Sequence, residues 1–283
     1  MESVIFQTYK DLEILVVDDA SSDSSYQVAL NYSNKDSRVK VYKNESNMGA
    51  YLNSIKCMEL ASGSFIKFVC ADDVLDTKAI SKFVAAFNTN EHIALTTSKF
   101  DLIDSKDSKL PDNENSKQIS DDSFYISGKE FGDYLLSKTI NSIGSPTATM
   151  FKKSCLFADA NSYILNKTER KPMFDMYWWI MIMANSDFAF ISDTLSYSRM
   201  HSEMSTFSPG ASARLNNTWI ELLNFAQSLG YLNNESTRLK AYCSLLVSNI
   251  LCLIRLVVKA ESKDNKLLIS KSIKITLTKI LKA

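Results

Sequence analysis

Two pairs of adjacent aspartates are the residues of this sequence that are best suited to chemistry. Asp18 and Asp19 follow the apolar run ILVV, and Asp72 and Asp73 follow the stretch FIKFVCA. Neighbouring carboxylates repel each other, so each pair requires a nearby cation or hydrogen-bond donor. Mg²⁺ and Mn²⁺ favour such oxygen ligands, especially beside phosphate. An aspartate that caps a helix or turn explains one pair equally simply, whereas two such pairs favour a ligand site.

The surrounding pattern predicts that both pairs lie where buried strands end. Up to about residue 100, short apolar segments alternate with helical segments of about ten residues, which is typical of βαβ units. The predicted strands are 12–17, 39–42, 65–69 and 93–97, and the predicted helices are 24–32, 50–60 and 78–87. Ligands of open α/β sheets bind beyond the carboxyl ends of the strands, so the two acidic pairs belong to one predicted ligand-binding edge.

The second half of the chain is less regular. A polar segment over 101–125 predicts a surface loop, and a helix is expected at 129–136. The aromatic sequence MFDMYWWIMIM, at 173–183, predicts a further helix, and strands are expected near 188–191 and 195–200. After Pro209 the pattern is wholly helical. The aromatic side chains Tyr177, Trp178 and Trp179 suit either a core or a platform for a sugar, and their spacing does not decide between the two.

Composition narrows the class of protein. The 283 residues are 45% hydrophobic and 23% charged, as in ordinary globular proteins, and the net charge of zero gives no indication of a nucleic-acid partner. The five cysteines are widely spaced and form no C-x-x-C motif, so neither a disulfide framework nor a zinc site is predicted. From residue 236 onward, however, the sequence has ten Lys or Arg residues and only two Asp or Glu residues. This basic tail indicates a membrane surface or a phosphate-rich partner.

The tail also bears on the membrane question. The longest apolar stretch without charge, 241–254, is shorter than the roughly 20 residues that cross a bilayer, so no spanning helix is predicted. The final segment LLISKSIKITLTKILKA places Ile269, Ile273, Leu277 and Ile280 on one helical face and lysines on another. Such a helix lies on anionic lipid, or else it docks on its own domain with the lysines in solvent; the sequence leaves both possibilities open.

The segment QTYKDLEILVVDDASSD, at 7–23, resembles the signature of family 2 glycosyltransferases of the GT-A fold. The unit RVKVYKNESNMGAYLNSIKCMELASGSFIKFVCADDVL resembles the part of that family that ends in a DxD-type metal motif. A looser resemblance continues through GSPTATMFKK and MFDMYWW to YSRMHSEMS. It implies an α/β GT-A domain over 1–205, with a Rossmann-like, mainly parallel sheet flanked by helices. Residues 1–100 would be its nucleotide-binding half, 101–205 its acceptor half, and 206–283 a helical extension.

The resemblance also implies roles for individual residues. Asp19 matches the carboxylate that hydrogen-bonds the nucleotide base, usually uracil. Asp73 matches the ligand of a Mn²⁺ or Mg²⁺ ion that bridges the donor diphosphate, and Asp72 matches the residue that contacts the ribose or the sugar. Asp175 matches the catalytic base, which in an inverting transfer takes the proton of the attacking hydroxyl. A helix N-cap within a core helix is the alternative for Asp175.

The motif YSRMHSEMS resembles the family pattern YRxHxxxxS, which concerns two further residues. In some members the histidine that corresponds to His201 reaches the metal or the diphosphate, while a structural role explains a lone histidine equally well. Arg199 would serve the phosphates. Two departures affect the site, because Phe174 replaces the glutamate that usually precedes the base and Cys70 stands where many members carry the first aspartate of the acidic cluster.

A larger departure lies at the beginning of the sequence. The family opens with a strand and a PTYN-type segment before SVLNQTY, whereas Met1 falls within MESVIFQTY. The first strand is absent from this sequence, so two alternatives are expected. Either the true start lies upstream of Met1, or the product is truncated and has an open sheet edge and half a nucleotide pocket.

Together these features predict a metal-dependent, inverting glycosyltransferase of the hexosyltransferase type. It would move a sugar from a nucleotide diphosphate, with UDP favoured, to a glycan or lipid-linked acceptor in bacterial surface polysaccharide synthesis. The expected location is the cytoplasm, at the inner face of the cell membrane. The alternative is a truncated, non-catalytic glycosyltransferase-like protein that acts as a binding or assembly subunit, and the missing first strand favours it.

Overall fold

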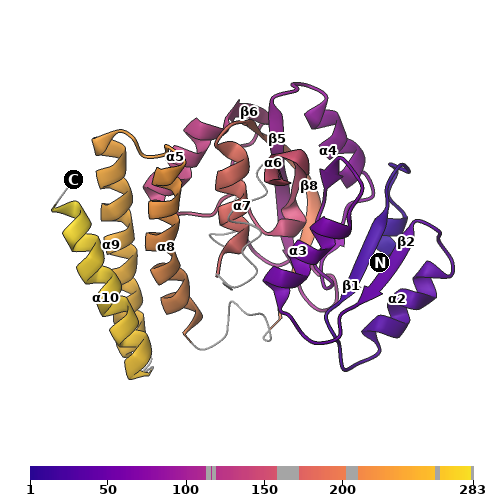
Figure 1. Ribbon diagram of the computed structural model, residues 1–283, viewed down its shortest axis with the longest axis horizontal. Coiled ribbons are helices and arrows are strands. Elements are labelled where there is room, and N and C mark those ends of the chain that lie inside the picture. Colours follow the sequence, from indigo (N-terminus) through magenta and orange to yellow (C-terminus); the bar gives the residue numbers. More distant parts are fainter. Residues whose placement is uncertain (113–115, 117–118, 158–171, 202–209, 259–261, 282–283) are drawn as a thin grey trace. The chain divides into compact units, whose positions relative to one another are not determined.

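The computed structural model describes residues 1–112, 116, 119–157, 172–201, 210–258 and 262–281 (Figure 1). The chain packs into two compact units. The first unit comprises Met1–Tyr125, Ile143–Arg170 and Ala189–Arg199, and the second comprises Ile126–Ser142, Lys171–Phe188 and Met200–Ala283. The second unit thus takes in two segments from within the range 1–205 that the sequence assigns to one domain. The helical character expected after residue 205 is present in the described part of that region.

The first unit begins with a small parallel sheet. Helix α1 (Glu2–Ile5) precedes strand β1 (Ile14–Asp18), and helix α2 (Ser25–Ser33) leads to strand β2 (Val39–Lys43). The two strands pair in parallel, with Ile14 opposite Val39 and Asp18 opposite Lys43. Helix α3 (Ala50–Leu60) then packs on β1, as α2 does on β2. The bounds of these strands and helices lie close to the predicted ones, because a turn sequence follows each short apolar run.

A six-stranded sheet forms the rest of the first unit. Its elements are β3 (Phe65–Ile66), β4 (Val74–Leu75), α4 (Ala79–Phe87), β5 (Ile93–Ile103), β6 (Phe124–Ser127), the 3₁₀ turn η1 (Pro146–Ala148), β7 (Thr149–Lys152), α6 (Ser154–Phe157) and β8 (Asp187–Arg199). The strand order is β3-β7-β5-β8-β4, with β6 on β8. The pairs β3–β7, β4–β8 and β5–β7 are antiparallel. The α/β class that the sequence predicts is confirmed.

Three predicted elements differ in extent. Strand β3 covers 65–66 instead of 65–69, because its pairing with β7 ends at Ile66. The strands expected near 188–191 and 195–200 are one continuous strand, β8, whose middle is held by the amide of Ser192, which donates to Ser123 Oγ at 2.9 Å. Strand β5 continues to Ile103, into the region expected to be loop. Pairing partners far away in the sequence thus decide where these strands end.

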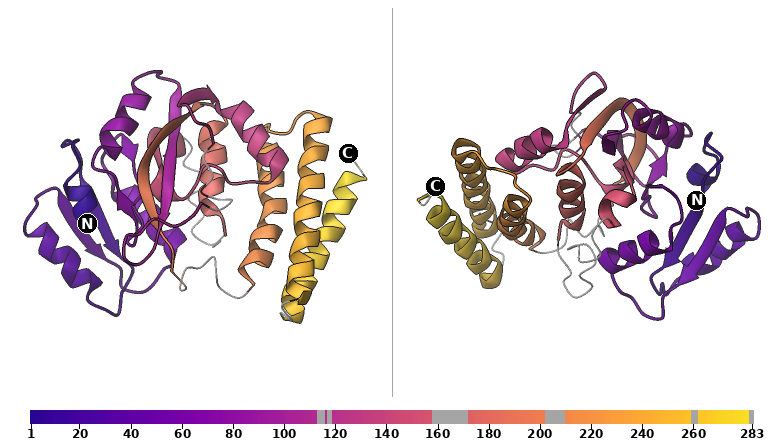
Figure 2. Two further views of the ribbon diagram at one scale, coloured as in Figure 1. Left: turned by 180° about the vertical axis from the view of Figure 1, so that it is seen from behind. Right: turned by 45° about the horizontal axis from the view of Figure 1, so that its top comes forward.

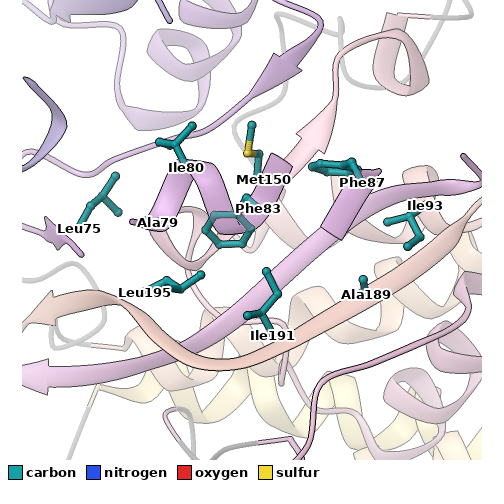
Figure 3. Close-up of a cluster of buried hydrophobic side chains, with 10 residues drawn as sticks. All are labelled: Leu75, Ala79, Ile80, Phe83, Phe87, Ile93, Met150, Ala189, Ile191 and Leu195. Atoms are coloured by element: carbon teal, nitrogen blue, oxygen red, sulfur yellow. The ribbon is translucent and has the colours of Figure 1, made fainter. Parts of the chain in front are cut away.

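Helix α4 supplies much of the core of the first unit. Its buried positions Ala79, Ile80, Phe83 and Phe87 repeat at helical spacing. Figure 3 shows these side chains with Met150 of β7 and with Ala189, Ile191 and Leu195 of β8, which belong to the same buried cluster. Burial of each large side chain contributes roughly 1.5–3 kcal/mol. This cluster therefore holds β8 in place, and with it Arg199 at the end of that strand.

The second unit is built from helices α5 (Gly128–Lys138), α7 (Phe174–Met183), α8 (Ala211–Ser228), α9 (Glu235–Val258) and α10 (Lys263–Ile280). Helix α7 is buried from Met176 to Met183 apart from Met181. The aromatic side chains Tyr177, Trp178 and Trp179 are at most 2% exposed. They therefore form core in this structure, which decides the question that their spacing left open.

The C-terminal helices pack against one another (Figure 2). Ile269 of α10 is fully buried and belongs to a cluster with Ala213 of α8 and with Cys252 and Leu256 of α9. The apolar face of α10 is thus largely docked on its own unit. Sequence analysis predicted no spanning helix, but α9 has the length and the apolar composition to cross a membrane. The prediction counted only the uncharged stretch between Lys240 and Arg255, whereas the helix extends beyond both; length and composition alone leave that prediction untested.

Candidate functional site

Asp19 lies directly after β1 and is held by the start of α3. Its Oδ1 accepts hydrogen bonds from the Met48 amide at 2.8 Å and from Asn44 Nδ2 at 2.8 Å, and its Oδ2 accepts from the Gly49 amide at 2.7 Å. Gly49 is the N-cap of α3 and has φ +82°, a conformation that glycine adopts without strain. The carboxylate therefore joins the end of β1 to the positive end of a helix.

The turn after Asp19 is sharp. Ala20 has φ +57°, in the left-handed region, and the Ser21 amide donates to Asp18 Oδ2 at 3.1 Å. Asp18 is buried. The two adjacent carboxylates thus differ in role, because Asp18 closes the turn on its own chain while Asp19 binds the loop before α3.

Asn44 extends the contacts of Asp19 into a polar network that sequence reasoning missed. It is 4% exposed, and its Nδ2 also donates to Asn53 Oδ1 at 2.9 Å. Lys56 Nζ donates to Asn44 Oδ1 at 2.7 Å, and Asn53 Nδ2 donates to the carbonyl of Val17 at 3.0 Å. The network fixes the carboxyl end of β1. No motif marked Asn44, since it follows β2 as an ordinary polar residue.

The second acidic pair lies in a tight turn. The Asp73 amide donates to the Cys70 carbonyl at 3.1 Å, which closes a four-residue turn over Cys70–Asp73. One potential ligand atom from each of Cys70, Asp72 and Asp73 lies within 4.8 Å of the others. Two donors that bind the same ion at about 2.0–2.4 Å lie no more than about 4.8 Å apart. Small side-chain rotations would therefore bring all three onto one divalent ion, so the donor set fits a metal.

Arg199, at the end of β8, holds this turn. Its amide donates to Asp73 Oδ1 at 2.9 Å and its Nε donates to the Asp72 carbonyl at 2.9 Å. Its Nη1 donates to the Asp104 carbonyl at 2.5 Å, and its Nη2 pairs with Asp107 at 2.6 Å. The structure thus brings together Arg199, Asp72 and Asp73, which the sequence had named separately as site residues, and the guanidinium connects the turn to the loop after β5.

Thr147, in η1, contacts the same turn from another side. Its Oγ1 accepts from the Cys70 amide at 3.0 Å, and its hydroxyl also hydrogen-bonds Asp73. Burial raises the pKa of Asp73 above its usual value, while the bonds from Thr147 and Arg199 act in the opposite direction. A carboxylate that is destabilised in this way gains from a bound cation. No sequence pattern singled out Thr147, whose role depends on the packing of η1.

Lys67 is a second residue near this turn that the sequence did not indicate. Its Nζ donates to the backbone carbonyls of Thr147 and Phe68 and lies 5.3 Å from the centre of the Phe83 ring. Burial lowers the pKa of this lysine to about 7, although the charges of the acidic turn act to raise it. The sequence indicated only that this residue lies within the predicted strand 65–69.

Asp175 and His201 belong to the second unit, whereas the other predicted site residues belong to the first. Asp175 lies in the first turn of α7 and is half-buried. Loss of hydration raises its pKa to about 6, although a hydrogen bond from the Met176 amide acts to lower it. A carboxylate with this pKa can accept a proton near neutral pH. His201 follows β8 by two residues and is half-buried.

Solved structures share this fold. The chain resembles TarS of S. aureus in complex with UDP-GlcNAc, with a TM-score of 0.57 and 17% identity over 96% of this chain and 86% of that chain. It also resembles GalNAc-T7 with UDP, GalNAc and Mn²⁺, with a TM-score of 0.52 and 13% identity over 78% of this chain and 44% of that chain. The architecture is the GT-A fold, with additional helices at the C-terminus.

The sequence identifies the family within this fold. The model of "Glycosyl transferase family 2" matches residues 1–157, more than half of the chain, and the chain belongs to that family. A relative in Campylobacter jejuni, GalNAc(5)-diNAcBac-PP-undecaprenol beta-1,3-glucosyltransferase, is 36% identical over 89 residues, which are 31% of this chain and 29% of the relative. The matched segments span less than two thirds of the length of such curated relatives.

Proposed function

We propose that this protein is a metal-dependent, inverting glycosyltransferase that moves a hexose from a UDP-sugar to a glycan or lipid-linked acceptor. The observation that carries the proposal is the Cys70–Asp73 turn, in which a thiol and two carboxylates converge within 4.8 Å at the end of a strand region of a family 2 fold. The UDP-GlcNAc complex of TarS supports a nucleotide-sugar donor. The undecaprenol-linked substrate in the name of the Campylobacter relative supports a lipid-linked acceptor, and we place the reaction in surface polysaccharide synthesis as part of the proposal.

In this proposal the first unit binds the donor. Asp19, fixed by the Met48 and Gly49 amides, contacts the uracil base. Asp73 and Cys70 hold a Mn²⁺ or Mg²⁺ ion, and Asp72 contacts the ribose or the sugar. When bound, the ion stabilises the charge that develops on the leaving diphosphate. Arg199 positions Asp73 through its backbone amide. Its guanidinium gives up its ion pair with Asp107, whose side chain is 73% exposed, and binds the phosphates instead.

The second unit would supply the base. The oxygen of the acceptor hydroxyl attacks the anomeric carbon, the bond from that carbon to the diphosphate oxygen breaks, and Asp175 takes the hydroxyl proton. The raised pKa of Asp175, about 6, suits a general base that works near neutral pH. His201 assists at the ion or the diphosphate. The protein acts in the cytoplasm at the inner face of the membrane, where a lipid-linked acceptor is presented.

Calorimetry of UDP binding tests the metal site. Wild-type protein should bind UDP with Mn²⁺ and lose most of this affinity in EDTA, because the diphosphate and the acidic turn repel each other without a cation. Asp73→Asn should lose this metal-dependent affinity for UDP. Asp122→Asn, which alters an exposed carboxylate before β6, is the matched control and should bind as wild type does. Equal binding with and without EDTA would refute the role of the turn.

One observation favours a second candidate, a non-catalytic binding or assembly subunit. In the described part of the chain, β1 pairs with β2 alone, and this small sheet is separate from the six-stranded sheet. A base pocket built at the end of β1 would then lack a neighbouring strand on one side. If the protein binds UDP through its metal site but neither hydrolyses nor transfers sugar from a panel of UDP-sugars, the subunit is the better assignment.

A further inference from the structure

Helix α9 is apolar on two faces, and only one of them is packed. Its inner face, with Tyr242, Leu245 and Leu256, is buried against the other helices of the second unit. Its outer face carries six large aliphatic side chains that are 43–78% exposed: Val247, Ile250, Leu251, Ile254, Val257 and Val258. Their spacing of three and four residues places them side by side along about 17 Å of helix. This set is called the α9 outer face below.

Such a surface requires a partner. Soluble monomers seldom expose contiguous aliphatic patches of this kind, and those that do commonly use them for binding. Exposed apolar side chains on α10, among them Leu267 and Ile275, add to the same helical pair. The outer face is therefore a docking surface, and the question is which partner it fits.

Charge on the same two helices indicates the partner. Exposed basic residues lie on the same two helices, namely Lys240, Arg255, Lys263, Lys271 and Lys274. Among the described residues of α9 and α10, the carboxylates are limited to Glu235 and Asp264. A bilayer with anionic headgroups offers apolar depth and negative charge together. Two copies of this chain that met through the same basic helices would repel each other.

Contacts of α9 indicate that it lies on the membrane instead of crossing it. Asn249 is fully buried on the inner face, and its Nδ2 donates to Ser272 Oγ of α10 at 2.9 Å. A helix that left the bundle to span a bilayer would lose this bond and place an amide in hydrocarbon, which is costly. Docking through the outer face alone keeps the bond and the inner packing.

We propose that the α9 outer face inserts into the headgroup region of an anionic membrane, while the lysines of α10 bind its phosphates. The sequence pattern left open whether the apolar face of α10 lies on lipid or docks on its own unit, and Ile269 of that face is docked on α8 and α9. The inference deepens the proposed function by naming the surface that brings the enzyme to a lipid-linked acceptor. It is independent of catalysis, since it concerns binding to lipid alone.

Co-sedimentation of the full chain with vesicles tests the proposal. Wild-type protein should bind vesicles that contain phosphatidylcholine and phosphatidylglycerol more strongly than vesicles of phosphatidylcholine alone, and added salt should reduce the difference. The double variant Ile250→Ser/Ile254→Ser should partition about tenfold more weakly or worse. Lys271→Glu/Lys274→Glu should lose the preference for phosphatidylglycerol.

Val28→Ser is the matched control, because Val28 is a similarly exposed aliphatic residue, 46% exposed, on α2. Unchanged binding by the isoleucine variant, or no binding of wild type to either vesicle, would overturn the proposal. Sedimentation velocity without lipid tests the alternative partner, which is a second copy of this chain. If the wild type forms a dimer and the isoleucine variant does not, the α9 outer face is a dimer interface. The same variants should bind UDP as the wild type does in calorimetry. This measurement distinguishes a loss of lipid binding from a defect in the proposed donor site.

Discussion

At the scale of single residues, Asp175 connects local structure to a pH profile. Loss of hydration raises its pKa to about 6, and only the deprotonated carboxylate can accept a proton. In the proposed transferase, kcat/KM should therefore fall as the pH drops below about 6. Asp175→Asn should lower kcat by roughly 10²–10⁴-fold, and its residual activity should no longer fall as the pH drops below about 6. If the activity of Asp175→Asn still falls at that pH, another group titrates there. The control Asp122→Asn should behave as the wild type does.

Cys70 gives the metal site a chemical signature. A thiol that binds a metal loses its proton to solvent, and soft thiolate ligands favour Zn²⁺ and Cd²⁺ over Mg²⁺. Because Cys70 lies within 4.8 Å of its carboxylate neighbours, Cd²⁺ titration should produce an ultraviolet thiolate-to-metal absorption band. Cys70→Ser should remove the band, and Cys243→Ser, which alters an exposed cysteine on α9, should retain it. Retention of the band in Cys70→Ser would exclude Cys70 as a ligand.

At the scale of elements, Gln7 shows how the N-terminal segment is attached to the sheet. The side chain is fully buried, its Nε2 donates to the carbonyls of Ser3 at 2.8 Å and Asp76 at 2.6 Å, and its Oε1 accepts from the Ile80 amide at 3.0 Å. These bonds join α1 to β4 and to the first turn of α4. The glutamine of the QTY sequence is therefore explained by structure, without a part in catalysis.

Gln7→Ala should destabilise the protein. It removes the partner of the Ile80 amide and leaves the Asp76 carbonyl with the Ala79 amide alone, and an unsatisfied buried group costs about 1–3 kcal/mol. We expect the free energy of unfolding, measured in urea, to fall by about 1–3 kcal/mol. Gln27→Ala, on the exposed side of α2, should change it by less than about 0.5 kcal/mol. A similar small effect at both positions would contradict the anchoring role of Gln7.

At the scale of the whole molecule, a net charge of zero conceals an uneven distribution. Residues 236–283 carry ten basic and two acidic residues, so the remainder of the chain is acidic by the same margin. In the described part of this range, the basic residues lie on α9 and α10, and α9 also exposes the aliphatic outer face. Membrane binding by this protein should therefore combine apolar insertion with a salt-sensitive attraction, and the vesicle experiment separates the two through the isoleucine and lysine variants.

Some features were determined by the sequence because they depend on local pattern. The short strands and helices up to Phe87 follow apolar periodicity and turn residues, so α3 begins and ends where predicted and β1, β2 and α4 differ by one or two residues. Asp72, Asp73 and Arg199 were each named as site candidates through motifs, whereas the hydrogen bonds between them appear only in the structure. The resemblance likewise predicted the GT-A fold, which the family match and the solved structures confirm.

Other features were decided by tertiary structure, because they depend on contacts between distant segments. Strand β3 ends at Ile66 where β7 stops pairing with it, and β8 is one strand because neighbours hold it along its length. Asn44 and Thr147 entered the site through hydrogen bonds that no local pattern encodes. The same reason applies to the C-terminal helices: an amphipathic pattern shows that a helix has an apolar face, but only the packing of Ile269 against its neighbours shows that this face of α10 is docked, and only the packing of α9 shows which of its apolar side chains remain exposed.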